Sequence, residues 1–191
     1  MSVTQRKPMS VAEFLDWEER QELRWEFDGF EPVAMTGGTA QASAVQSNLI
    51  GQLHTRLRGK PGRPYGSNLK VFVAGSIRYP DAFVVCSPVD PKATVVTEPV
   101  VVFEILSPST AMIDRVVKNE EYRDTPSIQR YVMLEQDRQA AEVFTRAGDD
   151  WVGHILSGEV VLPMPEIGIE LPLSDIYENI AFTETGASEA T

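Results

Sequence analysis

Two carboxylates stand at unusual places in the sequence. Glu104 interrupts the apolar, β-branched run 100–106, a pattern typical of a strand buried on both faces. Asp81 follows Tyr79-Pro80 and directly precedes a second apolar run, 82–86. An ionised carboxylate inside an apolar strand costs several kcal/mol unless it is paired or bound to a metal. Both acids therefore need a partner.

If the two strands are neighbours in one sheet, Asp81 and Glu104 can point at one spot. Two carboxylates together with water molecules form a typical magnesium site. Each acid also has an ordinary explanation, Glu104 as an acid paired with an arginine and Asp81 as a turn residue. Their joint placement favours a divalent-metal site.

Lys118 lies in the predicted helix that follows Glu104. Asp114 and Lys118 are spaced i,i+4, which favours a surface salt bridge worth less than about 0.5 kcal/mol. Alternatively, the ammonium group lies beside the metal site and orients water or stabilises a pentavalent phosphate. The spacing alone favours the salt bridge.

Other candidate residues give weaker signals. Glu26, in a strand-like stretch, is either a further metal ligand or a solvent-facing residue. His54 and His154 lie far apart and lack ligand spacing, which gives little support to a zinc site or a histidine base. Ser107 and Ser109 lack a Gly-x-Ser-x-Gly elbow, which disfavours a serine hydrolase.

The hydrophobic pattern predicts a mixed α/β domain with strands and helices interspersed. Expected helices cover 11–20, 41–58, about 112–123, a short segment beginning at Pro126, and 173–177. Expected strands cover 25–27, 33–35, 69–73, 82–86, 100–106, 131–134, 141–145 and 151–156. Ser10 and Glu13 have the spacing of a capping box, and Thr39 is a candidate N-cap. We expect one domain over residues 1–182 and a disordered tail over 183–191.

Several segments together resemble the Uma family of bacterial proteins, described as restriction-endonuclease-like. They are Met9-Ser10-x-x-Glu13-Phe14, Arg24-Trp25-Glu26-Phe27, Val33-Ala34-Met35-x-Gly37-Gly38, Arg78-Tyr79-Pro80-Asp81, Val102-Phe103-Glu104-Ile105-Leu106-Ser107-Pro108-Ser109-Thr110, Asp114-Arg115-x-x-Lys118-x-x-x-Tyr122 and Pro126-Ser127-x-x-x-Tyr131-Val132. The similarity covers about residues 9–180. Its most specific parts are the Tyr-Pro-Asp and Glu-Ile-Leu-Ser-Pro-Ser-Thr segments.

The resemblance implies the PD-(D/E)xK nuclease superfamily and its restriction-endonuclease-like core, a central mixed β-sheet flanked by helices. Asp81 and Glu104 would then be the metal-binding acids. The peptide carbonyl of Ile105 would be another ligand, and Glu26 would be the acid from the N-terminal part. The implied cofactor is magnesium or manganese, and the implied reaction is metal-assisted hydrolysis of phosphodiester bonds.

One position departs from the superfamily pattern. The lysine usually found two residues after the second acid is Leu106 in this chain. The family pattern instead has a lysine in the following helix, which here is Lys118. Its side chain would reach the same site from another backbone position and neutralise developing charge, which makes it the third expected catalytic residue.

The charge of the chain limits its partners. Among 191 residues there are 17 Lys and Arg and 28 Asp and Glu, so the formal net charge is 17 − 28 = −11. Proteins that coat DNA nonspecifically are usually basic, so a nucleic-acid substrate, DNA rather than RNA, would need a local basic patch. Candidate patches are Arg56, Arg58, Lys60 and Arg63, and Arg115 with Lys118.

A second hypothesis is a catalytically inactive nuclease-fold module that serves as a scaffold for protein interaction or dimerisation. The acidic composition and Leu106 favour the scaffold, whereas the presence of Asp81, Glu104 and Lys118 together favours the nuclease. Magnesium or manganese binding distinguishes the two hypotheses.

Assembly and location follow from family analogy and composition. Nucleases of this general kind often cut two strands with two subunits, so a homodimer is expected. The chain has one cysteine, Cys86, no apolar run near the length of a membrane helix, and no secretory signal. These features predict a cytoplasmic protein without a membrane partner.

Overall fold

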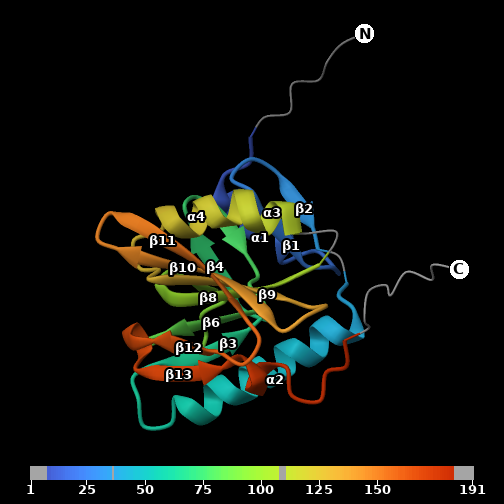
Figure 1. Cartoon of the computed structure of the whole chain (residues 1–191). Coiled ribbons are helices and arrows are strands. Elements are labelled where there is room, and N and C mark those ends of the chain that lie inside the picture. The colour runs from blue at the N-terminus through green and yellow to red at the C-terminus, as the bar shows by residue number, and fades with distance from the viewer. Residues whose placement is uncertain (1–7, 36, 108–110, 183–191) are drawn as a thin grey trace, which may run out of the picture.

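A six-stranded mixed β-sheet carries both predicted central strands (Figure 1). The computed structural model describes residues 8–35, 37–107 and 111–182. The strand order is β11 (Asp150–Ser157), β10 (Ala140–Ala147), β9 (Arg130–Glu135), β8 (Pro99–Leu106), β6 (Ala82–Val85) and β3 (Arg63–Gly66). The pair β8 and β9 is parallel, and the other neighbours are antiparallel.

Two smaller sheets make up the rest of the β structure in the described residues. The first has the order β2 (Pro32–Ala34), β1 (Trp25–Phe27), β5 (Ser76–Arg78), β4 (Lys70–Val73) and β7 (Val95–Val96). The second is the hairpin of β12 (Val161–Met164) and β13 (Ile169–Pro172).

The helices are few. They are α1 (Val11–Glu18), α2 (Ala40–Arg56), the consecutive segments α3 (Ala111–Ile113), η1 (Asp114–Lys118) and α4 (Asn119–Asp124), the 3-10 turn η2 (Pro165–Ile167), and α5 (Leu173–Ile176). The predicted caps are confirmed: Ser10 and Glu13 form a capping box, and Thr39 accepts a hydrogen bond from the N–H of Ala42. None of the helices in the described ranges is long and apolar enough to cross a lipid bilayer.

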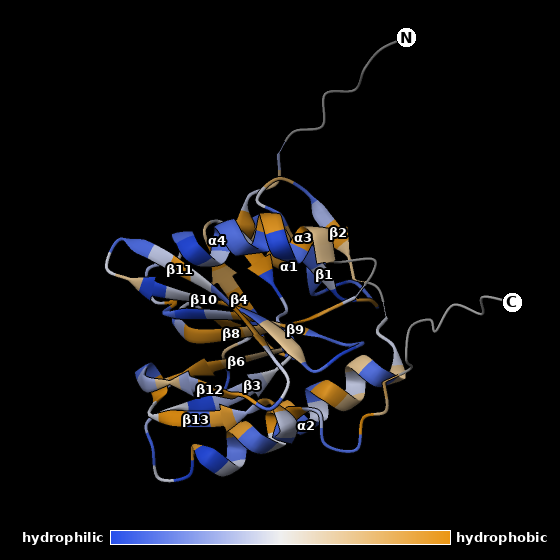
Figure 2. Ribbon diagram, viewed as in Figure 1, coloured by the Kyte–Doolittle hydropathy of each residue, from blue (hydrophilic) through white to orange (hydrophobic). Residues whose placement is uncertain are grey.

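The two faces of the six-stranded sheet are covered by different layers. Helix α2 packs Val45, Leu49 and Leu53 on one face, together with α5 and the β12–β13 hairpin. Strand β4 and helix α4 cover the other face. Strands β6 and β8 lie between these layers and are largely apolar, which explains their burial (Figure 2).

The differences from the sequence prediction have local causes. The short helix expected at Pro126 is wrong: Thr125 has an extended backbone, and the N–H of Ile128 closes a turn onto the carbonyl of Thr125. Pro126 and Ser127 therefore form a single turn, and the chain enters β9 at Arg130. The helix expected at about 112–123 is present, but its middle turn is a π-helix. The tail 183–191 lies outside the described residues, and the single domain stays a prediction.

Candidate functional site

Asp81 and Glu104 come from adjacent strands. In the antiparallel pair of β6 and β8, Ala82 lies opposite Phe103. Extending this register by one residue places Asp81 opposite Glu104, and opposite residues of a ladder point to the same face. The carboxylate Oδ2 of Asp81 accepts a hydrogen bond of 2.7 Å from the N–H of Ile105. The condition set by the sequence, that the two strands be neighbours, is met.

The backbone of Ile105 faces the same gap as Asp81. In a β-strand, the N–H and C=O of one residue point to the same edge. Because the N–H of Ile105 reaches Asp81, its carbonyl is directed to the space beyond the start of β6. This direction fits the predicted role of the Ile105 carbonyl as a ligand.

Lys118 projects inward from the π-helix η1. The wider turn is closed by the N–H of Asn119 donating to the carbonyl of Asp114, five residues earlier. The Nζ of Lys118 lies 3.0 Å from Oε1 of Glu104, 3.6 Å from Oε1 of Glu26 and 3.1 Å from Oδ1 of Asp114. The i,i+4 pair with Asp114 therefore exists, but in the interior, since only 9% of the Lys118 side chain is exposed.

Glu26 is buried and does not face solvent. Its Oε1 accepts a hydrogen bond of 3.0 Å from the N–H of Tyr79, and its Oε2 accepts one of 3.1 Å from Arg78. Arg78, itself buried, also donates hydrogen bonds to both carboxylate oxygens of Glu121, at 2.7 and 2.6 Å. A bidentate arginine–carboxylate pair holds both groups in one orientation. Glu121 therefore orients Arg78, and Arg78 in turn orients the side chain of Glu26 on β1.

Sequence reasoning missed Arg78, Glu121 and Gln46 as members of the site. The side-chain amide of Gln46, on α2, donates to the carbonyl of Asp81 at 2.8 Å and to Oγ of Ser67 at 3.0 Å. Of these three residues, only Arg78 carried a signal in the sequence, because it is a charged residue directly before the Tyr-Pro-Asp segment. Glu121 and Gln46 are polar residues on helices, where such residues are ordinary.

The cluster contains more acids than bases. It has five carboxylates and two cations, a net charge of −3 (2 − 5) if all are ionised: Glu26, Asp81, Glu104, Asp114 and Glu121 against Arg78 and Lys118. A buried excess of negative charge must be relieved by protons or by a bound cation.

The pKa values follow from this imbalance. Burial, reinforced by Asp81, Asp114 and Glu26, raises the pKa of Glu104 to about 8, although Lys118 acts in the opposite direction. Burial also raises the pKa of Asp81. For Glu26, burial is outweighed by Lys118 and Arg78, which lower its pKa. At neutral pH and without a metal, Glu104 therefore holds a proton while Glu26 is ionised.

The donor set suits a magnesium or manganese ion. Within the described ranges, no three His, Cys, Asp or Glu side chains are already gathered around one point. Lys118 lies between the acids and supplies part of the missing positive charge. Magnesium, however, needs only one or two carboxylates and keeps several waters. Asp81, Glu104 and the Ile105 carbonyl meet that requirement.

Comparison with known proteins gives consistent matches. Residues 11–174 match the family model described as "Uma2: Putative restriction endonuclease". Two uncharacterized proteins of Synechocystis sp. (strain ATCC 27184 / PCC 6803 / Kazusa) are similar along most of their length. The protein slr1290 is 31% identical over 178 residues, covering 91% of this chain and 94% of its own. The protein sll1609 is 29% identical over 167 residues, covering 83% and 93%.

A solved structure has the same fold. It is described as "a putative nuclease belonging to DUF820 from Anabaena variabilis ATCC 29413" and superposes with a TM-score of 0.73. The match covers 89% of this chain and 98% of that chain at 19% identity. The predicted fold class, a mixed sheet flanked by helices, is confirmed.

Proposed function

Because this chain belongs to the Uma2 family, described as putative restriction endonucleases, we propose that it is a metal-dependent nuclease that hydrolyses phosphodiester bonds of DNA. The observation that carries the proposal is the common face of Asp81 and Glu104 with the buried ammonium group of Lys118 beside them. A lysine next to two acids is the arrangement that phosphoryl chemistry needs.

Each residue has a role that follows from its contacts. Asp81, Glu104 and the Ile105 carbonyl would hold magnesium or manganese, with Glu26 as a further ligand through the oxygen that faces Lys118. When bound, the ion would polarise the phosphate and lower the pKa of a coordinated water. Glu104 would give up its proton on becoming a ligand.

Lys118 takes the role of the lysine that the superfamily usually has at the position of Leu106. Leu106 is buried in the apolar layer between β8 and β4 and offers no polar group. The ammonium group of Lys118, raised in pKa by Glu104, Glu26 and Asp114 despite its burial, stays charged. It would therefore neutralise the charge that develops on the phosphate in the transition state.

Cleavage of a linear DNA duplex with magnesium or manganese tests the proposal. We expect Asp81→Asn and Lys118→Gln to lower the rate at least 100-fold, because the first removes a ligand of the ion and the second removes the cation beside the reacting phosphate. The exposed Glu170→Gln on β13 loses the same type of charge far from the site and should cleave like the wild type. Folded wild-type protein that cleaves nothing and binds neither ion would instead support the scaffold hypothesis.

We also propose a cytoplasmic homodimer. The edge strand β11 supports dimerisation, because Ile155 is 80% and Val152 is 44% exposed on it. Uncovered edge strands with apolar side chains are favourable contact surfaces for a second copy. The single thiol of Cys86 suits a reducing compartment.

A further inference from the structure

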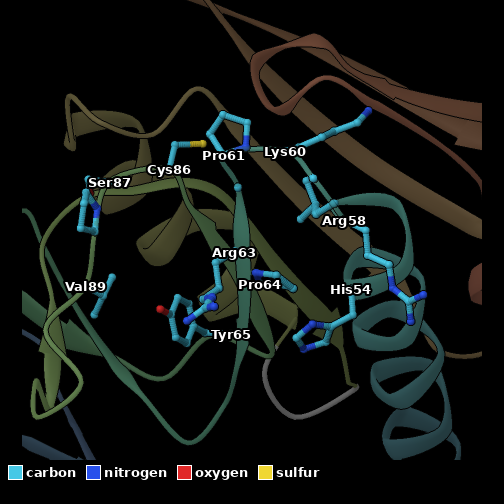
Figure 3. A pocket seen from close by; sticks show the side chains of 14 residues that line it. His54, Arg58, Lys60, Pro61, Arg63, Pro64, Tyr65, Cys86, Ser87 and Val89 are labelled. Carbon is cyan, nitrogen blue, oxygen red and sulfur yellow. The ribbon is translucent and has the colours of Figure 1, made fainter.

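A hollow of about 890 Å³ lies away from the carboxylate cluster, where the end of α2 meets β3 and the loop that follows β6 (Figure 3). Its lining includes His54, Arg58, Lys60 and Arg63 and contains no Asp or Glu. In a chain with 28 acids and 17 bases, a concave surface with three cations and no acid runs against the average composition. Such a surface attracts anions.

The positive charge of this hollow is not neutralised by neighbouring acids. Arg58 and Arg63 are exposed, and within the described ranges neither forms an ion pair. In the same part of the chain, the ammonium group of Lys60 donates only to the backbone carbonyl of Gly168. Their charges are therefore available to a ligand.

The other predicted basic residues are occupied. Arg56 pairs with Asp175, and Arg115 pairs with Glu135 and Glu142. Since Lys118 is buried among acids, the second patch predicted from the sequence, Arg115 with Lys118, offers no free cation. Of the two predicted patches, only the one at the end of α2 remains.

Strand β3 connects the hollow to the carboxylate cluster. In its antiparallel pairing with β6, Arg63 lies opposite Val85 and Tyr65 opposite Phe83. Phe83 and Val85 follow Asp81 by two and four residues, so Arg63 and Tyr65, which lie opposite them, share the sheet face of Asp81. Four residues of strand span about 13 Å. Since β3 is the outer strand, this path runs along an open edge.

The acidic site itself cannot hold a polyanion well, because its excess carboxylates repel phosphate groups. A substrate therefore needs a second point of attachment with positive charge. Arginine is suited to this task because its planar group binds phosphate through two hydrogen bonds. Tyr65 stacks on Phe83 at 5.5 Å and is only half-buried, so it adds an aromatic surface of the kind on which bases stack.

We propose that the hollow binds the phosphate backbone of the nucleic-acid strand, at about 13 Å from the phosphate held at Asp81 and Glu104. Arg58 and Arg63 contact phosphates, and Tyr65 contacts a base. The inference rests on the proposed function, because it takes the substrate to be the one that is cleaved.

Binding without cleavage tests the inference. In chelator, fluorescence anisotropy would follow a labelled 20-nucleotide strand and its duplex. We expect Arg58→Gln with Arg63→Gln to raise Kd roughly tenfold at low salt and to reduce the salt slope by about 1.5–2, the loss of two phosphate contacts. The matched double variant Arg20→Gln with Arg138→Gln loses the same charge at two exposed positions outside the hollow and should change Kd less than about twofold.

A second measurement locates the ligand. Cys86 lines the hollow and is the only thiol of the chain, so bound nucleic acid should slow its alkylation by a maleimide in the wild type. Equal Kd values for the two double variants, or unchanged alkylation under saturating nucleic acid, would overturn the inference. So would stronger binding of polyglutamate than of nucleic acid.

The outcomes separate the two proposals. If the wild type binds nucleic acid through Arg58 and Arg63 but never cleaves it, the result supports binding at the hollow and overturns the nuclease proposal. If cleavage depends on Asp81 but not on Arg58 and Arg63, and the arginine variant has unchanged Kd and KM, only the proposal of nucleic-acid binding at the hollow is overturned.

Discussion

The carboxyl group of Glu104 accepts two hydrogen bonds at the same oxygen, 2.8 Å from the hydroxyl of Tyr122 and 3.0 Å from Lys118. Its other oxygen accepts no hydrogen bond from the residues that the structure describes, and it can carry the proton that the raised pKa implies. Truncation to alanine would leave the buried Tyr122 hydroxyl without its partner and open a cavity. Glutamine is the better probe, because it keeps the shape and the acceptor but cannot ionise.

Stability should therefore depend on pH through Glu104. Its pKa rises from 4.5 to about 8 on folding, so the folded chain holds the proton more tightly than the unfolded chain. The resulting stabilisation is complete below pH 4.5 and is lost as the pH approaches 8. Relative to Glu104→Gln, the wild type should lose about 1–3 kcal/mol between pH 5 and 8 in chelator.

Urea unfolding of both proteins at several pH values measures this difference. Because the other acids are common to the two proteins, most of their titration cancels. A difference that stays constant from pH 5 to 8 would show that Glu104 is already ionised in the folded state.

The segment formed by α3, η1 and α4 has an inverted burial pattern. Asp114 and Lys118 are 2% and 8% exposed, whereas Met112 and Val116 are 75% and 56% exposed. In an ordinary amphipathic helix, the apolar residues face the core. Here the acids on β1 and β8 attract Lys118 inward, and the π-helical turn accommodates it.

Lys118→Met should destabilise the metal-free protein by about 2–4 kcal/mol at pH 7, because it leaves Glu104, Glu26 and Asp114 without their shared cation. The loss should shrink as the pH falls, because Glu26, whose pKa Lys118 helps to lower, takes up a proton more readily without that cation. The exposed Val117→Thr on the same turn is the matched control and should change stability by less than about 0.5 kcal/mol. Chemical unfolding of the three proteins decides whether Lys118 acts as an interior cation or as a weak surface partner.

The elements predicted well from sequence are those with long or capped patterns. Strands β6 and β8 stand out because their apolar runs are continuous, and α1 and α2 because a cap precedes an apolar stripe. Short segments such as β3, which contains Pro64 and Gly66, carry no such signal. The π-turn and the inward direction of Lys118 depend on contacts with distant strands, which periodicity cannot reveal.

Over the whole molecule, the net charge of −11 is unevenly distributed. The interior cluster holds five carboxyl groups against two cations, and the hollow beside α2 carries unpaired positive charges. Sequence analysis could identify Asp81, Glu104, Lys118 and Glu26 as candidates from strand patterns and family resemblance. It could note Arg78 as a charged residue beside Tyr79-Pro80-Asp81 but not its role, which arises from the meeting of β5 with β1 and α4.

The charge excess leads to a prediction for the folded protein as a whole. An ion that binds the folded state alone stabilises it by about 2.7 kcal/mol at 100 times its Kd, which corresponds to roughly 5–10 °C in Tm for a chain of this size. Manganese should therefore raise the Tm of the wild type at pH 8 by this amount, whereas sodium chloride of equal ionic strength should not. In Asp81→Asn and Glu104→Gln the rise should nearly vanish, because each lacks one of the two carboxylate ligands, while Glu170→Gln should keep it. At pH 6 the rise should be smaller, since the ion must displace the proton that Glu104 holds. Equal manganese shifts in the wild type and in both site variants would mean that the ion binds elsewhere, and that protons and Lys118 alone balance the buried acids.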